Sequence, residues 1–158
     1  MKADRRQDAL PMTRQAKASV WAVRIAFAVV FFLNVQCAVQ FILWPGSFTG
    51  SYELSGVAGE AAVRGLGIAF LMWNCTYPAV IIRPERFKAL GVVVLVQQAI
   101  GLVGETLLSA SLPGGHAILQ GGVSRFALFD GLGLVLMPAT FIWMMVVLRQ
   151  ASANKAGL

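Results

Sequence analysis

The sequence has little charge and few residues that hold metals. Asp, Glu, Lys and Arg make up 13% of its 158 residues, whereas soluble domains carry about a quarter. His116 is the single histidine, and Cys37 and Cys75 are the only cysteines, without the C-x-x-C spacing of thiol redox sites. Transition metals normally need two or more His or Cys ligands, and haem needs an axial ligand. We therefore expect no metal, haem or other cofactor, and we interpret His116 as a solvated loop residue.

The sequence is instead rich in long apolar runs. Hydrophobic residues make up 58% of the chain, and four runs exceed the roughly 18 residues that indicate a membrane-spanning helix. This pattern predicts an all-α fold, an integral membrane bundle of four transmembrane helices over residues 20–148, with no room for a soluble domain. The predicted spans are residues 20–43, 61–82, 89–110 and 126–148.

Outside the spans, positive charge is confined to one side of this topology. Lys and Arg occupy the tail 1–19, the short loop after residue 82 and the tail 149–158, whereas the loops 44–59 and 111–124 contain neither. Segments rich in Lys and Arg stay on the cytoplasmic side of a membrane, so both termini are expected in the cytoplasm (N-in/C-in). The basic tails are expected to contact anionic lipid headgroups of the bilayer, and no nucleic-acid partner is expected.

Polar residues follow one face of every predicted helix, and a four-helix bundle can turn all of these faces inward. Asn34 and Cys37 lie in the first span, Asn74 in the second, and Gln98 shares a face with Glu105 in the third. Polar groups inside a membrane are costly, so they indicate either helix pairing or a functional site.

The charged residues of the spans gather at one depth. Five of them fall in the outer halves, away from the cytoplasmic side, and we expect the two arginines to bridge the three carboxylates in some combination. One carboxylate is then left over. Glu105 is the candidate for it, because it lies deepest and has no arginine on its own helix. The five residues are Glu60, Arg64, Glu105, Arg125 and Asp130.

This cluster has a structural and a functional interpretation. In the first, charged pairs fix the register of the helices, and the protein is an accessory or structural bundle, either a homo-oligomer or a subunit of a larger membrane complex. This hypothesis predicts fully paired charges and no cavity.

In the second interpretation the protein is a binder, transporter or enzyme for a lipophilic molecule of quinone or isoprenoid type that enters from the outer leaflet. Glu105 would then be the acid or proton carrier, and Glu105 and Asp130 are the candidate catalytic residues. Proton-coupled export is the third hypothesis, but the essential acid of four-helix exporters usually lies in the first helix, which has none here. The predicted ligand-binding residues are Glu60, Arg64, Gln98, Glu105, Arg125 and Asp130.

Four segments resemble the small DoxX-like four-helix membrane proteins of bacteria: Val63–Gly67, Arg83–Phe87, Gly101–Glu105 and Arg125–Phe126. DoxX-like proteins have a similar length, four spans and an Arg-Gly near the start of the second helix. Some are thought to be membrane subunits of quinone-linked oxidoreductases or partners of redox enzymes. The resemblance implies a bacterial inner-membrane location and an accessory or small-molecule-binding role, and it assigns no catalytic residue.

Overall fold

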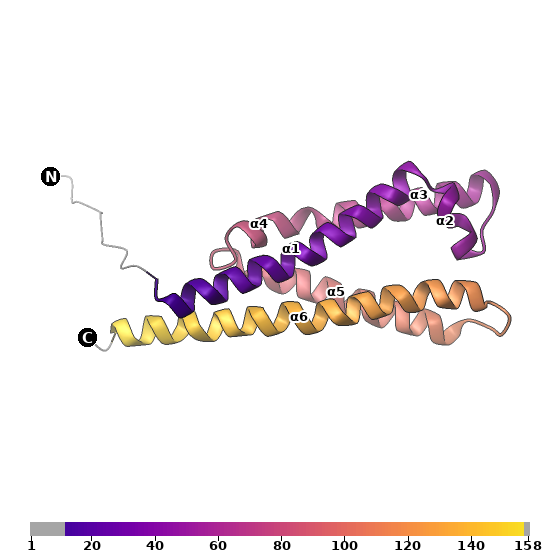
Figure 1. Cartoon of the computed structure of the whole chain (residues 1–158). Helices are drawn as coiled ribbons and strands as arrows, with labels where there is room; N and C mark the ends of the chain where they lie inside the picture. The colour runs from indigo at the N-terminus through magenta and orange to yellow at the C-terminus, as the bar shows by residue number, and fades with distance from the viewer. Residues whose placement is uncertain (1–11, 157–158) are drawn as a thin grey trace.

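The computed structural model describes residues 12–156, in which every regular element is helical. Four helical segments are long and apolar enough to cross a membrane: α1 (Arg14–Leu43), α3 to α4 (Gly56–Ile82), α5 (Lys88–Ser111) and α6 (Ala117–Ala156). The predicted all-α chain with four long apolar helices is confirmed. The helices lie side by side as an elongated bundle (Figure 1).

The two ends of this bundle carry different connections (Figure 1). The start of α1, the end of α6 and the turn between α4 and α5 lie at one end, here called the proximal end. The connections from α1 to α3 and from α5 to α6 lie at the other, the distal end. Two short elements, α2 (Gly46–Thr49) and the 3-10 turn η1 (Gly50–Tyr52), belong to the first distal connection.

The helices extend beyond the apolar runs that predicted them. α1 already begins at Arg14, where Thr13 Oγ1 accepts a hydrogen bond of 3.2 Å from the backbone N–H of Ala16 and so caps the helix. α6 begins at Ala117, well before the fourth apolar run. Polar helix ends need only backbone hydrogen bonds to form, so hydropathy does not detect them. Residues 1–11 and 157–158 of the predicted tails lie outside the described residues.

The second apolar run forms two helices instead of one. α3 (Gly56–Trp73) is followed by the 3-10 turn η2 (Asn74–Thr76) and by α4 (Tyr77–Ile82). Pro78 has no backbone N–H and cannot make the α-helical hydrogen bond to the carbonyl of Asn74, so the helix tightens at this point. The break places Asn74 and Tyr77 in the middle of the bundle.

Close contact between α1 and α3 depends on a glycine. A Cβ atom at Gly67 would lie 2.8 Å from the backbone oxygen of Ala38 and 2.8 Å from the Cβ of Phe41. A backbone carbonyl cannot move aside as a flexible side chain can, so only glycine allows the two helices to approach this closely. α1 also packs against α6, and α6 against α5.

The main apolar core lies toward the proximal end. Phe27 of α1 and Met144 of α6 are fully buried there, and the ring of Phe27 packs against those of Tyr77 and Phe141. The core is formed by Val20, Val23, Ala26, Phe27, Val30, Tyr77, Val80, Val94, Met137, Phe141 and Met144.

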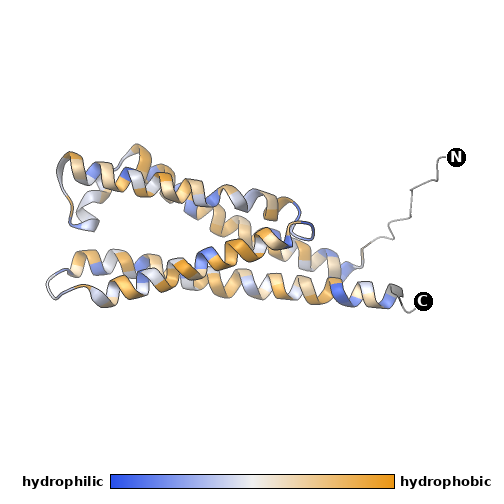
Figure 2. Ribbon diagram, turned by 180° about the vertical axis from the view of Figure 1, so that it is seen from behind, coloured by the Kyte–Doolittle hydropathy of each residue, from blue (hydrophilic) through white to orange (hydrophobic). Residues whose placement is uncertain are grey.

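The helices are apolar along much of their length (Figure 2), and many of their large apolar side chains are exposed. Phe32 is 66% exposed and Val135 is 71% exposed, and every long helical segment carries further exposed Val, Ile or Leu side chains. Soluble monomers rarely expose continuous apolar surfaces of this extent.

Candidate functional site

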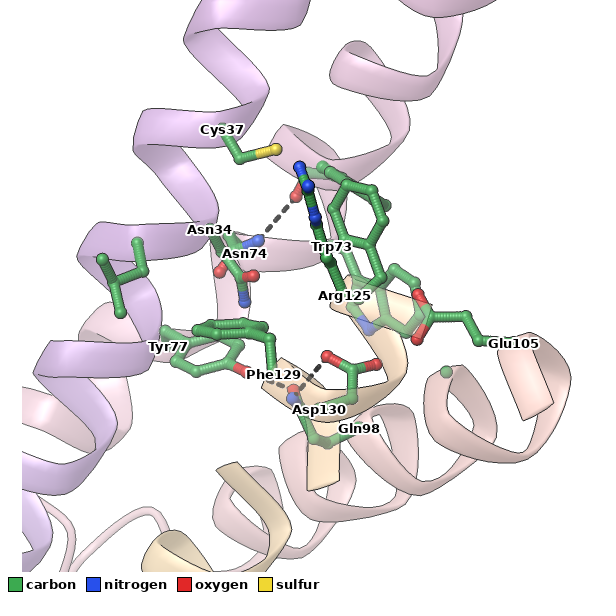
Figure 3. A pocket seen from close by; sticks show the side chains of 14 residues that line it. Asn34, Cys37, Trp73, Asn74, Tyr77, Gln98, Glu105, Arg125, Phe129 and Asp130 are labelled. Carbon is green, nitrogen blue, oxygen red and sulfur yellow. Dashed lines mark hydrogen bonds between the residues drawn. The ribbon is translucent and has the colours of Figure 1, made fainter. Parts of the chain in front are cut away.

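A cavity of about 240 Å³ lies between α1, the α3–η2–α4 segment, α5 and α6. It occupies the distal half of the bundle, and we call it the distal cavity. Five of its lining residues are aromatic and six carry polar or charged side chains other than tyrosine, so its wall is mixed (Figure 3). The lining residues are Leu33, Asn34, Cys37, Phe70, Trp73, Asn74, Tyr77, Gln98, Gly101, Glu105, Arg125, Phe126, Phe129 and Asp130.

A chain of hydrogen bonds runs along the cavity wall across three elements. The hydroxyl of Tyr77 donates to Gln98 Oε1 at 3.3 Å, and Gln98 Nε2 donates to Asp130 Oδ1 at 2.7 Å (Figure 3). Tyr77 is 2% exposed and Gln98 is 5% exposed. The carboxylate of Asp130 is therefore held by an amide donor in place of an arginine.

Two glycines leave room for these side chains. A Cβ atom at Gly101 of α5 would collide with Asp130 Oδ2, and one at Gly133 of α6 would lie 2.9 Å from Gln98 Nε2. Any larger residue at either position would push the amide and the carboxylate apart. The sequence places each glycine on the polar face of its helix, and the structure shows what this spacing allows.

The predicted ion pairs between arginine and carboxylate do not form. Among residues 12–154, whose side chains are described, the one ion pair is that of His116 with Glu53. Asp130 Oδ1 accepts a hydrogen bond from Gln98, and the Arg125 side chain runs along the cavity toward Cys37 of α1, away from Asp130 (Figure 3). The expectation of pairing was wrong, because helical periodicity gives a face and a depth but no side-chain direction.

Glu105 lies at the edge of the distal cavity without a partner. Its side chain is half-buried, and Oε2 is neither exposed to solvent nor hydrogen bonded. Asn74, which is 4% exposed, also leaves an oxygen without a donor. Buried polar atoms of this kind are rare in proteins and need an explanation.

Four of the six predicted ligand-binding residues line the distal cavity, and two do not. Gln98, Glu105, Arg125 and Asp130 belong to the lining. Glu60 and Arg64 have exposed side chains outside it, and the Glu60 carboxylate lies instead beside Gly46 at the distal connection. The predicted ligand contacts themselves stay predictions.

The aromatic part of the lining was missed by the sequence analysis. Neither Tyr77 nor the four other ring residues were among the predicted site residues, because hydropathy does not distinguish a ring that faces a cavity from one that fills a core. The rings are those of Phe70, Trp73, Tyr77, Phe126 and Phe129.

Glu53 was also missed, although it joins the two distal connections. Its backbone has φ of 53°, its Oε2 accepts a hydrogen bond of 2.5 Å from Nδ1 of His116, and its Oε1 accepts one of 3.3 Å from the N–H of Leu119. The hydrogen bond from His116, together with that from Leu119, holds the pKa of Glu53 below its usual range. Leu119 belongs to the first turn of α6, where a carboxylate is favourable. We call this group the Glu53 clasp.

At the proximal end, Arg24 is a further charged residue that was not among the predicted site residues, because it lies within the first apolar run. Its Nη2 donates a hydrogen bond of 2.7 Å to the backbone oxygen of Ile82 at the end of α4. A cation is favourable at the C-terminus of a helix, where carbonyl groups lack donors. Arg24 therefore has a structural contact away from the distal cavity.

Comparison with protein-family models, with curated proteins and with solved structures finds no match to this chain. The resemblance to DoxX-like proteins stays a prediction.

Proposed function

We propose that this chain is a multi-pass protein of the bacterial inner membrane that binds a lipophilic small molecule in the distal cavity. The membrane location is supported by four helical segments long enough to cross a bilayer and by their apolar outer surface. The distribution of Lys and Arg supports cytoplasmic termini, which puts the distal cavity in the outer half of the membrane.

The observation that carries the binding function is the distal cavity itself, bounded by buried polar atoms without partners. A bundle whose charges only fix helix register would be expected to pair them and to pack tightly. Here Glu105 Oε2 and Asn74 Oδ1 have no partner, and a space of about 240 Å³ remains beside them. Ligand sites combine an apolar wall with a few placed polar groups in this way.

The two cysteines provide the test, because one lines the distal cavity and the other does not. Cys37 belongs to the lining, whereas Cys75 is exposed outside it. Two single-cysteine variants, Cys75→Ser and Cys37→Ser, are modified with methyl methanethiosulfonate in detergent micelles with increasing 1-naphthol, an aromatic probe with one polar group. Intact-mass spectrometry follows the modification. We expect 1-naphthol to slow modification of Cys37 in a saturable way and to leave Cys75 unaffected.

A matched pair of glycine variants controls for effects of the probe on the micelle. Gly101 borders the cavity, whereas a Cβ atom at Gly104 on the same helix meets nothing within 4 Å. Gly101→Leu should abolish the protection of Cys37, and Gly104→Leu should preserve it. Equal slowing at both cysteines, or no slowing at Cys37, would contradict the proposed function.

A further inference from the structure

We propose that the ligand of the distal cavity is a lipophilic amine in its protonated form, held by its ammonium group at Glu105 and Asp130. Its apolar body lies against the aromatic rings of the lining. This inference rests on the proposed binding function and names the chemical class that the cavity recognises. Three features of the lining carry it: its hydrogen-bonding groups, its charge and its rings.

The buried polar atoms of the lining that lack partners are acceptors. Asn74 Nδ2 donates to the backbone oxygen of Phe70 at 2.7 Å, and because a carbonyl oxygen can only accept, this contact fixes which end of the amide is nitrogen. Asn74 Oδ1 is then left without a donor, as is Glu105 Oε2. A ligand that satisfies these two atoms must donate hydrogen bonds. An ammonium group has donors only, whereas a carbonyl head has none.

The charges of the lining also favour a cation. Glu105 and Asp130 contribute two carboxylates and Arg125 one guanidinium, and neither carboxylate lies within ion-pair distance of that guanidinium. The Arg125 side chain is directed toward Cys37, away from Asp130 (Figure 3). An anionic ligand beside two carboxylates would be repelled. A cationic ligand would instead compensate the one carboxylate charge that the Arg125 guanidinium does not balance.

The aromatic rings suit the same ligand. Trp73 and Phe129 are seen beside the polar groups in Figure 3, and three more rings complete the wall. The faces of aromatic rings attract cations and also pack against an apolar body. The cavity volume of about 240 Å³ is below the roughly 300 Å³ at which drug-sized pockets begin. One ring with a short aminoalkyl chain is therefore the expected size.

Three probes of similar shape and different charge test the inference: 3-phenylpropylammonium, 3-phenylpropan-1-ol and 3-phenylpropanoate. Each is titrated against modification of Cys37 in the Cys75→Ser background, with Glu105 intact or changed by Glu105→Gln. Each probe is compared with itself between the two variants, so its partitioning into the micelle cancels. Glu105→Gln keeps the size of the side chain and removes only its charge.

We expect the ammonium probe to protect Cys37 and to lose about tenfold in affinity in Glu105→Gln, since a close charge pair at a binding site contributes at least this factor. The alcohol should change little, and the carboxylate should bind weakest to the unaltered cavity. The matched control is Glu60→Gln, which removes a carboxylate from the distal end outside the lining and should leave the affinity for the ammonium probe unchanged.

The outcomes separate this inference from the proposed function. Two outcomes would overturn the inference and leave the binding function standing. In the first, 1-naphthol protects Cys37 but 3-phenylpropylammonium does not. In the second, the affinity for 3-phenylpropylammonium is the same in Glu105→Gln as in the protein with Glu105. Stronger protection by 3-phenylpropanoate would assign recognition to Arg125 and also overturn the inference. If no probe protects Cys37, 1-naphthol included, both proposals fail.

Discussion

The proximal and distal halves of the bundle use the same four helical segments and are packed in opposite ways. In the proximal half, Phe27, Val94 and Met144 are fully buried in a continuous apolar core. In the distal half, the same helices surround a cavity with Gln98, Glu105 and Asp130 in its wall. The difference shows that close apolar packing is confined to the proximal half, whereas the distal half contains unfilled space.

The boundary between the two halves lies where the second helical segment is broken. The turn η2 at Asn74–Thr76 separates α3 from α4, and Tyr77 directly after it belongs to both regions. Its ring packs on Phe27 in the proximal core, while its hydroxyl donates to Gln98 in the cavity wall. The polar network is thus anchored to the closely packed proximal core, which holds its side chains in position.

The largest expected effect tests whether the proximal half supplies the stability. Phe27→Ala should lower the free energy of unfolding by about 2 kcal/mol, mostly from the cavity it creates, because in the proposed membrane location lipid is as apolar as the core and the transfer term is small. The matched change Phe126→Ala, in the wall of the distal cavity, should cost less than about 1 kcal/mol, because it enlarges a space that already exists. Unfolding by SDS in mixed micelles measures both. Equal costs would remove the distinction between the two halves.

An intermediate effect is expected at the hydrogen-bonded chain. Gln98→Met removes both bonds and leaves the Tyr77 hydroxyl and the Asp130 carboxylate without this partner, at a cost of about 1 kcal/mol in the free energy of unfolding. The neighbouring Gln97 has a buried Oε1 without a partner. Gln97→Met removes this unsatisfied atom and breaks no hydrogen bond of the chain, so it should not lower the free energy of unfolding. The same SDS titration compares the two variants. A larger loss in Gln97→Met would show that the chain does not stabilise the distal half.

The smallest effect is expected at the Glu53 clasp and depends on pH. Because its hydrogen bonds hold the pKa of Glu53 below the usual range, the clasp stabilises the folded state fully above the unfolded pKa of this carboxyl. That stabilisation is lost as the pH falls through the lowered folded value, below about pH 4. Hydrogen exchange at the Leu119 amide, which donates to Glu53, reports it.

We expect the protection factor of Leu119 to decrease with acidification in the unaltered chain. In Glu53→Gln it should already be low at neutral pH and should not decrease further. The core amide of Val94 serves as the internal reference. The same acid dependence in both proteins would show that the clasp does not join the two distal connections.

Much of the architecture could be predicted from the sequence. Four uninterrupted apolar runs predict four long helices, because only helices satisfy the backbone hydrogen bonds of such segments in lipid. Helical periodicity placed Gln98 and Glu105, seven residues apart, on one face of the third helix, and both line the distal cavity together with Asp130 of the fourth. Pro78 could have indicated the break in the second run, but proline is common enough in membrane helices for a run to continue through it.

Only the tertiary structure decided how these groups meet. The five charged residues predicted in the outer halves of the spans are two arginines and three carboxylates, and charge alone predicts that they pair. In the folded chain Gln98 donates a hydrogen bond to Asp130, and Arg125 extends toward Cys37. Glu60 and Arg64 lie outside the distal cavity. Helix rotation and the space left by Gly101 and Gly133 fix these contacts. Apolar patterning determines the helices because it acts along the chain, whereas pairing and the cavity depend on distances of a few ångströms between helices that no local pattern specifies.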